Sequence, residues 1–259
     1  MNGIRNVPLK GSFIVASGRC GGYALDMNRA LPCIVVGVVL AVGGRVSGAE
    51  EILLKDVSFD RPLVLDDTAR YRLENVRITG LADCAALMLS GRIGSVTIDH
   101  CAFGNIWAGS EGKAAAMECA GAAVGTLVVT DSVFFDAEHH LISLKEGSFG
   151  RVTLERCRFF VSESCLRRLY ADNPWRTWPP VMEFHNIDRL ELLDNEFENT
   201  TVVIHPSVKK VVVRGKLPEG WQVLNRQATR VIRLDEVPAA QAVAREHEDC
   251  AAACAGACE

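Results

Sequence analysis

The sequence predicts an all-β, single-domain fold in which short strands stack as a parallel β-helix, a type of solenoid. Three observations lead to this prediction. An eight-residue pattern recurs along the middle of the chain and reads apolar, any, apolar, any, polar, small, any, Phe. Its first and third places follow the two-residue period of a strand with one buried face. Its copies are 19 to 38 residues apart, which is close to the spacing of stacked repeat proteins.

The copies align place by place, and the insertions between them fall at the expected turns. They occupy residues 52–59, 71–78, 96–103, 127–134, 152–159 and 190–197, and a degenerate copy follows at 211–213. If each copy lies directly above the previous one, equal places form columns of neighbouring side chains. The sixth-place column would contain Val57, Val76, Cys101, Ser132, Cys157 and Asn195, and the eighth-place column Phe59, Ile78, Phe103, Phe134, Phe159 and Phe197.

A second apolar segment precedes several copies and predicts a further strand in each layer of the stack. These segments are residues 86–89, 141–144, 181–184 and 202–204. Gly94, Gly125 and Gly150 stand at three of the junctions, where we expect turns. Each layer therefore holds roughly three short strands, and about six to seven layers fit within residues 50–235.

The repeat copies, of which Leu190-Glu191-Leu192-Leu193-Asp194-Asn195-Glu196-Phe197 is one, resemble those of the right-handed parallel β-helix (pectin lyase-like) superfamily. This superfamily includes pectate lyases and polygalacturonases. The resemblance covers about residues 52–215 and implies a right-handed solenoid that acts on polysaccharide. No stretch of the chain matches the signature of one enzyme family.

The N-terminal 49 residues read as a leader. Met27-Asn28-Arg29 is a short positive start, residues 31–42 are almost entirely apolar, and small residues end at Ala49, where cleavage is expected. The sequence therefore predicts a secreted, periplasmic or cell-surface protein with no stable membrane span after processing, because a span needs about 20 apolar residues. An uncleaved anchor is the alternative, and translation from Met1 or from Met27 is left open.

Residues 236–259 form a short tail rich in Ala and Cys. Cys250, Cys254 and Cys258 would share one face of a helix, and they suit either an intermolecular disulfide or a metal ion. The net charge of −4, with no basic face evident in the sequence, argues against a nucleic-acid partner.

The fourth and fifth places of the repeat predict one charged patch across four layers, formed by Asp99, His100, Asp131, Glu155, Arg156 and Asp194. Asp99 and Glu155 lie two layers apart, about 9–10 Å by the strand spacing. This separation is near that of the two carboxyl groups of an inverting glycosidase, and Asp131 lies between them. Alternatively, Asp99, Asp131 and Glu155 bind Ca²⁺ while Arg156 takes a sugar proton, as the resemblance to pectate lyases implies. The third interpretation is a salt-bridged ladder that only aligns the layers.

The longest insertion, residues 161–180, is the second candidate site. It contributes the candidate ligand-binding residues Arg167, Arg168, Tyr170, Trp175, Arg176 and Trp178. Aromatic rings stack on sugars, and Arg side chains grip carboxylates or sulfates. The alternative is a flap that covers one side of the solenoid.

Histidines form a third candidate. Asp136, Glu138, His139 and His140 share one turn and suit metal binding or acid–base chemistry, although adjacent turn histidines are often only solvated. His185 and His205 end strand segments of later layers, and we expect them to lie near one another.

Two functions follow as expectations. The first is binding or degradation of an acidic polysaccharide or cell-surface glycan, with no required cofactor and Ca²⁺ as a candidate. The second is a non-catalytic envelope scaffold or a protein-binding solenoid, which the short length of the solenoid favours. The oligomeric state is left open.

Overall fold

The computed structural model describes residues 51–66, 70–108, 114–172, 179–218, 220–224 and 229–236. All of them fall within one unit of the chain, Val39–Glu259. The expected leader (1–49), the Cys-containing part of the tail, and Trp175, Arg176 and Trp178 lie outside the described residues.

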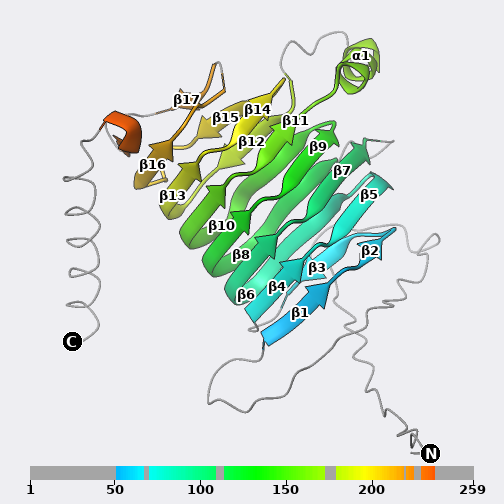
Figure 1. The fold of residues 1–259 in the computed structure, drawn as a ribbon, viewed down its shortest axis with the longest axis horizontal. Coiled ribbons are helices and arrows are strands. Elements are labelled where there is room, and N and C mark those ends of the chain that lie inside the picture. Colours follow the sequence, from blue (N-terminus) through cyan, green and yellow to red (C-terminus); the bar gives the residue numbers. More distant parts are fainter. Residues whose placement is uncertain are drawn as a thin grey trace, which may run out of the picture. The chain divides into compact units, whose positions relative to one another are not determined.

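Most of the described chain is β-strand, arranged in two sheets whose strands all pair in parallel (Figure 1). The larger sheet contains β1 (Glu51–Lys55), β3 (Leu63–Leu65), β4 (Arg70–Glu74), β6 (Ala85–Asp99), β8 (Ala115–Thr130), β10 (His140–Glu155), β12 (Val181–Phe184), β13 (Ile187–Leu193), β15 (Thr201–Ile204), β16 (Lys210–Arg214), β17 (Gln222–Val223) and β18 (Arg230–Arg233). The smaller sheet contains β2 (Ser58–Phe59), β5 (Arg77–Ala82), β7 (Ala102–Trp107), β9 (Val133–Ala137), β11 (Arg158–Phe160) and β14 (Glu196–Glu198). A 3₁₀ turn, η1 (Leu234–Glu236), follows β18. The all-β prediction is confirmed, and the parallel stacking is compatible with a β-solenoid.

The repeat copies stack in sequence order and in the predicted register. In the smaller sheet Phe59 pairs with Ile78, Ile78 with Phe103, and Phe103 with Phe134. The column continues through Phe159 to Phe197. The rings of Phe103, Phe134, Phe159 and Phe197 follow one another with centroid separations of 5.3, 5.3 and 5.4 Å. The eighth place of the repeat therefore forms an aromatic ladder inside the core.

A left-handed residue produces the bend between the two sheets in every full copy of the repeat. The fifth-place residues all have φ between 49° and 52°, and they are Asp56, Asn75, His100, Asp131, Arg156 and Asp194. Asn and Asp tolerate this conformation well because their short side chains bond locally, whereas Arg rarely adopts it. One left-handed residue turns the strand so that the sixth and eighth places point into the core again.

In three layers the sixth-place side chain accepts a backbone hydrogen bond from the layer before it. The Val76 amide donates to Cys101 Sγ (3.3 Å), and the Cys101 amide donates to Ser132 Oγ (2.9 Å). The Cys157 amide donates to Asn195 Oδ1 (2.9 Å), and Asn195 Nδ2 returns a bond to the Leu154 carbonyl (2.8 Å). Backbone N–H groups that the bend removes from the sheet are thereby satisfied inside the core, where an unpaired one would be costly.

Burial keeps the two sixth-place thiols protonated. It raises the pKa of Cys101 to about 11 and that of Cys157 to about 12. Both thiols are buried and free, and each donates to a nearby backbone carbonyl. Since the thiolate is the reactive form, these cysteines are packing residues rather than nucleophiles.

The structure differs from the sequence expectation at the glycine junctions. β6, β8 and β10 are single strands of 15, 16 and 16 residues that run through the expected turns, with register shifts near Ser90 and Glu146. The glycines are still required there, because a Cβ on Gly125 would lie 2.6 Å from the Gly94 carbonyl oxygen. Close stacking of backbone, rather than a turn, explains Gly125 and Gly150.

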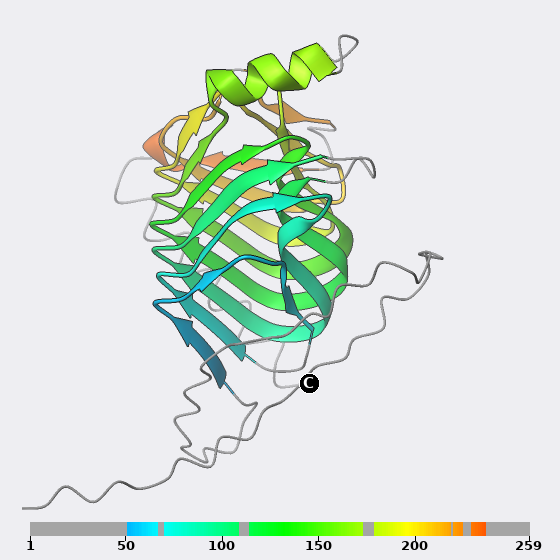
Figure 2. The same cartoon turned by 90° about the vertical axis from the view of Figure 1, so that its right-hand side faces the viewer.

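The insertion at residues 161–180 contains a helix, α1 (Glu163–Asp172), where the sequence suggested a loop. Ser162 caps it, since its Oγ accepts from the Cys165 amide at 3.2 Å. Cys165 and Leu169, one turn apart, are buried. In Figure 2, α1 lies outside both sheets, across the ends of the strands. Nowhere among the described residues is there a helix with the length and hydropathy that a membrane crossing requires.

The aromatic ladder gives a direct test of the core. Phe134 is fully buried between two rings, so Phe134→Ala should lower the free energy of unfolding by about 3–5 kcal/mol. Phe160→Ala, in the half-buried outer pair with Phe135, should cost clearly less. Urea unfolding of both variants measures the difference, and equal losses would contradict the inward placement of the eighth place.

Candidate functional site

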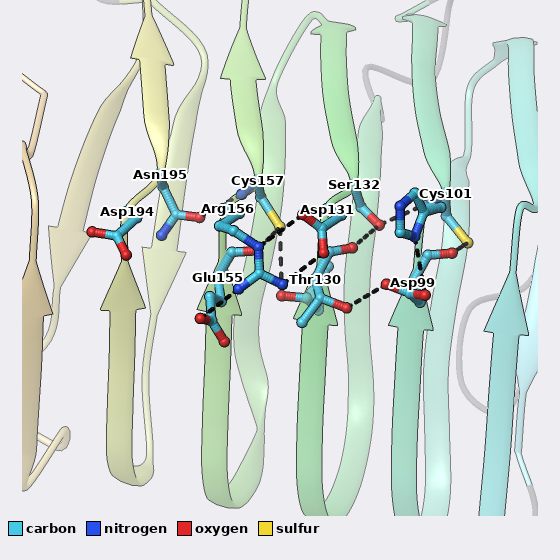
Figure 3. Close-up of polar contacts among 12 residues, drawn as sticks. Asp99, Cys101, Thr130, Asp131, Ser132, Glu155, Arg156, Cys157, Asp194 and Asn195 are labelled. Carbon is cyan, nitrogen blue, oxygen red and sulfur yellow. Dashed lines mark hydrogen bonds and ion pairs between the residues drawn. The ribbon is translucent and has the colours of Figure 1, made fainter.

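The structure brings the predicted charged patch together as a column along the bend, which we call the charged column (Figure 3). Its members are Asp99, His100, Asp131, Glu155, Arg156 and Asp194. Arg156 forms a two-pronged ion pair with Asp131 (2.9 and 2.7 Å) and a further one with Glu155 (2.6 Å). Arg214 joins Glu155 (3.4 Å) to Asp194 (2.6 Å).

At the other end of the charged column, Asp99 contacts a hydroxyl group of the next layer and an imidazole of its own layer. Thr130 Oγ1 donates to Asp99 Oδ1 (2.6 Å), and His100 Nδ1 lies 3.0 Å from Asp99 Oδ2. The carboxylates of successive layers are therefore each paired along the stacking direction.

The electrostatics of the charged column favour fixed charge over proton transfer. The hydrogen bond from Thr130 lowers the pKa of Asp99, and the hydrogen bond from Arg156 lowers the pKa of Asp131. The Asp131 hydrogen bond in turn raises the pKa of Arg156, and the Asp99 hydrogen bond raises the pKa of His100. A general acid near neutral pH needs a raised carboxyl pKa, and an Arg base needs a lowered one. The shifts of Asp99, Asp131 and Arg156 run against acid–base catalysis, whereas the raised pKa of His100 does not.

Asp99, His100 and Asp131 each offer one ligand atom within 4.8 Å of the others, which is close enough to share a cation. Glu155, the third expected Ca²⁺ ligand, is not in this group and contacts Arg156 and Arg214 instead. Arg156 already places a positive charge on Asp131, so the ladder interpretation accounts for the contacts with no metal ion.

Of the candidate residues in α1, Arg168 attaches the helix to the strands. Arg168 donates to the buried carboxylate of Glu138 (3.0 and 2.7 Å) and lies over the Trp107 ring. Arg167 forms an exposed pair with Glu163 one turn earlier, and Tyr170 is half-buried. Arg168 is therefore a docking residue, and Arg167 has the most exposed side chain of the three.

The structure also shows a row of cationic residues that the sequence analysis missed, and we call it the basic column. Arg151 pairs in register with Arg189, Arg189 with Lys210, and Lys210 with Arg230, on four neighbouring strands. These residues occupy the place just before the first apolar residue of each copy. The aligned repeat copies contain this column in the sequence, one place before the first apolar residue. The sequence suggested no basic face because the cations are far apart along the chain.

A buried carboxylate organises one end of the basic column. Glu191 is only 3% exposed, and it accepts from Arg151 (3.0 and 2.7 Å), Arg189 (2.7 Å) and Thr153 (2.7 Å). Burial opposes its charged form, but the hydrogen bonds from Thr153 and Arg151 still hold the pKa of Glu191 below its ordinary value. Two guanidinium groups are thus fixed by one carboxylate.

A shallow groove of about 530 Å³ runs beside this end of the basic column. Gly94, Gly125 and Gly150 line it together with Arg92, Asn186 and Asp188. Gly150 directly precedes Arg151, and Asp188 directly precedes Arg189. The groove therefore crosses several layers next to the Glu191-bound arginines.

The third predicted cluster is rearranged around Glu183 of β12. Glu183 lies 3.5 Å from His140 Nε2, 3.0 Å from His185 Nε2 and 2.7 Å from Lys145 Nζ. Burial, aided by Lys145, lowers the pKa of His140 to about 4. The predicted proximity of His185 and His205 is confirmed, since their rings stack with centroids 4.2 Å apart.

Backbone strain at Arg156 can be separated from its ion pairs. Arg156→Gly and Arg156→Ala both remove the pairs, but only Gly accepts φ of 51° freely. We expect the Gly variant to be about 1 kcal/mol more stable in urea unfolding. Arg158, in β11 outside the bend, should show the reverse order. An Ala variant at position 156 that equals or exceeds the Gly variant would refute the strained bend.

The lowered pKa of His140 predicts a loss of stability in acid. The unfolded chain takes up this proton near the ordinary His pKa of about 6.5, whereas the folded protein resists it until about pH 4. The stability that His140 contributes is full above pH 6.5 and is lost as the pH falls towards 4. Between pH 7 and pH 4.5 the loss is about 2–3 kcal/mol.

His140→Gln should remove that part of the pH dependence while all other titrating groups stay the same. Urea unfolding of both proteins at pH 7 and pH 4.5 gives the comparison. An identical pH dependence in the two proteins would show that His140 is not held neutral by the fold.

The charged column, the basic column and the Glu183 cluster thus lie on the described strands at positions set by the repeat register. No protein-family model, no curated protein and no solved structure matches this chain.

Proposed function

We propose that the protein binds an acidic polysaccharide without cleaving it, through the basic column. The observation that carries this proposal is the pair Arg151 and Arg189, held by the buried Glu191 and continued in register by Lys210 and Arg230. Guanidinium groups whose positions are already fixed lose little freedom when they bind a carboxylate or a sulfate.

The spacing of the basic column supports a linear ligand. Neighbouring strands are about 4.8 Å apart, which is similar to the length of one sugar unit in an extended chain. A polysaccharide with one acidic group per unit, running along the stacking direction, would meet one cation per layer. The groove beside Gly125 and Gly150 gives such a chain room next to Arg151.

We extend the proposal to the type of solenoid, its number of layers and the export of the protein. We propose a right-handed parallel β-helix of the pectin lyase-like type with six to seven layers, exported by the leader at residues 1–49. The register of the repeat copies supports the first part, and the apolar run at residues 31–42 supports the second. Binding requires no cofactor in this scheme, because Arg and Lys supply the positive charge that Ca²⁺ would otherwise provide.

The non-catalytic character is supported by the charged column. Asp99 and Asp131 have lowered pKa values and are engaged in hydrogen bonds or ion pairs, as is Arg156, whose pKa is raised. A scaffold role in the cell envelope is compatible with the same observation, since such contacts hold the layers in register.

Changing Arg151 or Arg189 would remove an ion-pair partner of the buried Glu191 and disturb the fold. The sharper variant therefore changes the other two cations of the basic column. Lys210→Gln combined with Arg230→Gln removes two cations of the basic column while Arg151 and Arg189 stay paired. We expect affinity for polygalacturonate to fall roughly fivefold to thirtyfold, at about 0.5–1 kcal/mol per lost ion pair. Arg77→Gln with Arg158→Gln is the matched control on the smaller sheet, with the same loss of charge.

Titration calorimetry at two salt concentrations measures the effect, with dextran and duplex DNA as other ligands. Affinity for polygalacturonate should weaken with salt, and EDTA should leave it unchanged because the site uses no metal ion. Equal losses in the two double variants would refute the basic column as the site. If duplex DNA binds more tightly than polygalacturonate, the ligand of the basic column is a nucleic acid and not a glycan. New reducing ends on the polysaccharide would show cleavage and refute the non-catalytic assignment.

A further inference from the structure

The first strand of the stack, β1, has a strand neighbour on one side only. It lies at one end of the larger sheet and pairs with β4 alone among the described strands (Figure 1). The Asp56 amide, next to the end of β1, donates to the Glu74 carbonyl of the following layer at 3.0 Å. Because backbone groups of successive strand residues point to opposite sides, every second residue of β1 turns its N–H and C=O groups away from β4. These residues are Glu51, Leu53 and Lys55.

The sequence of β1, Glu-Ile-Leu-Leu-Lys, is complementary to itself in the antiparallel direction. With Leu53 on a two-fold axis, Glu51 of each copy lies directly opposite Lys55 of the other. The same register sets the three outward-turned backbone groups opposite one another, which is the hydrogen-bonded arrangement of an antiparallel pair. Opposite charges at directly opposed positions stabilise such a pair, and Leu53 meets its own copy between them.

Both charged side chains of this pairing are accessible. Glu51 is exposed, and the Lys55 side chain is 55% exposed. Lys55 Nζ lies 2.9 Å from Glu74, whose other carboxylate oxygen lies 2.5 Å from Arg72. Glu74 therefore keeps a cationic partner when Lys55 contacts a second copy.

The end of the hydrophobic core next to β1 is incompletely covered by the described residues. The apolar side chains of this first layer pack against the core but are only partly buried, and they are Ile52, Val57, Phe59 and Leu63. Val64 of β3, in the same layer, is 45% exposed. Stacked repeats need such end layers to be covered, and a copy that pairs at β1 lies over this end.

The proposed export determines what is left of the chain to cover this end, and the inference rests on that part of the proposed function. Cleavage after Ala49 leaves one residue, Glu50, ahead of β1. One residue is too short to form a strand beside β1, so the edge stays open for another chain, as edge strands do unless they are blocked.

We propose that two copies of the processed protein associate end to end as a two-fold symmetric dimer, in which β1 pairs antiparallel with β1 of the second copy around Leu53. Two-fold interfaces are the commonest in homo-oligomers, and they require one self-complementary surface. The pairing joins the larger sheets of the two copies, and it closes because both copies use the same edge. The basic column lies on later layers and takes no part in it.

Sedimentation tests the dimer on protein expressed as the full-length chain in a host that exports it. Reducing conditions prevent a dimer linked by the tail cysteines. The wild type should have twice the chain mass at about 100 μM, where a micromolar Kd gives mostly dimer. Glu51→Lys places like charges opposite one another twice and should raise the Kd about tenfold or more. Glu51→Lys combined with Lys55→Glu restores opposite charges and should recover most of the lost affinity.

Leu53→Glu and Ile232→Glu are a matched pair of variants. Both residues occupy the second place of the repeat, one in β1 and the other in β18 at the opposite end of the sheet. Leu53→Glu should remove the dimer, because two carboxylates would meet at the two-fold axis, and Ile232→Glu should leave it unchanged. Circular dichroism and urea unfolding show whether each variant is folded.

A wild type that stays monomeric at this concentration would overturn the proposal. Unchanged dimers in folded Glu51→Lys and Leu53→Glu would also overturn it, and loss of the dimer in Ile232→Glu alone would replace it by a head-to-tail contact. The intact mass of the same sample shows separately where the chain begins. A retained leader would refute the proposed export, while the variants at Glu51 and Leu53 still decide the pairing of β1.

Discussion

The bend between the two sheets is the constraint on which the rest of the structure depends. At this point one residue per layer adopts a left-handed conformation, and its N-terminal and C-terminal neighbours pair with different sheets. The strand would lose backbone hydrogen bonds here if the sixth-place side chain did not replace them. Cys101, Ser132 and Asn195 do so from within the core, although they differ in size and chemistry. In these three layers a small polar or polarisable atom at the sixth place therefore joins one layer to the layer before it.

Both charged surfaces follow from that register. The fifth-place side chain leaves the bend towards solvent in every layer, so charges that are distant in sequence become neighbours, as Asp131 and Arg156 do. Mixed signs along the charged column let the layers pair with one another. Along the basic column, by contrast, four cations follow in order, and the buried Glu191 pairs with Arg151 and Arg189. Like charges in register are unfavourable on their own, which is why this column is the surface that an anionic ligand would stabilise.

The sequence predicted the stacking well because a period of two and a Phe at a fixed place within most copies of the repeat are local signals. The columns of Cys101, Ser132 and Cys157, and of Phe103, Phe134 and Phe159, were read from the sequence and found in the structure. The helix α1 was not predicted, since its cap depends on Asp136 of an earlier layer, which holds Ser162. The bond between Arg168 and Glu138 and the rearranged cluster around Glu183 were missed for the same reason, because each depends on which layers become neighbours after an insertion.

The most direct measurement is a disulfide cross-link between two earlier layers, at the repeat place that the basic column occupies in later layers. Ser95 and Thr126 are register partners at the same place of the repeat as Arg151 and Arg189. Ser95→Cys with Thr126→Cys should form a disulfide under mild oxidation, because register partners in adjacent strands are about 5 Å apart. Ser95→Cys with Val128→Cys, displaced by two residues on the same face, should remain reduced, since Cα atoms more than about 7 Å apart cannot be bridged. The buried thiols of Cys101 and Cys157 are not expected to interfere. A cross-link in the displaced pair and none in the register pair would contradict the stacking from which both columns derive.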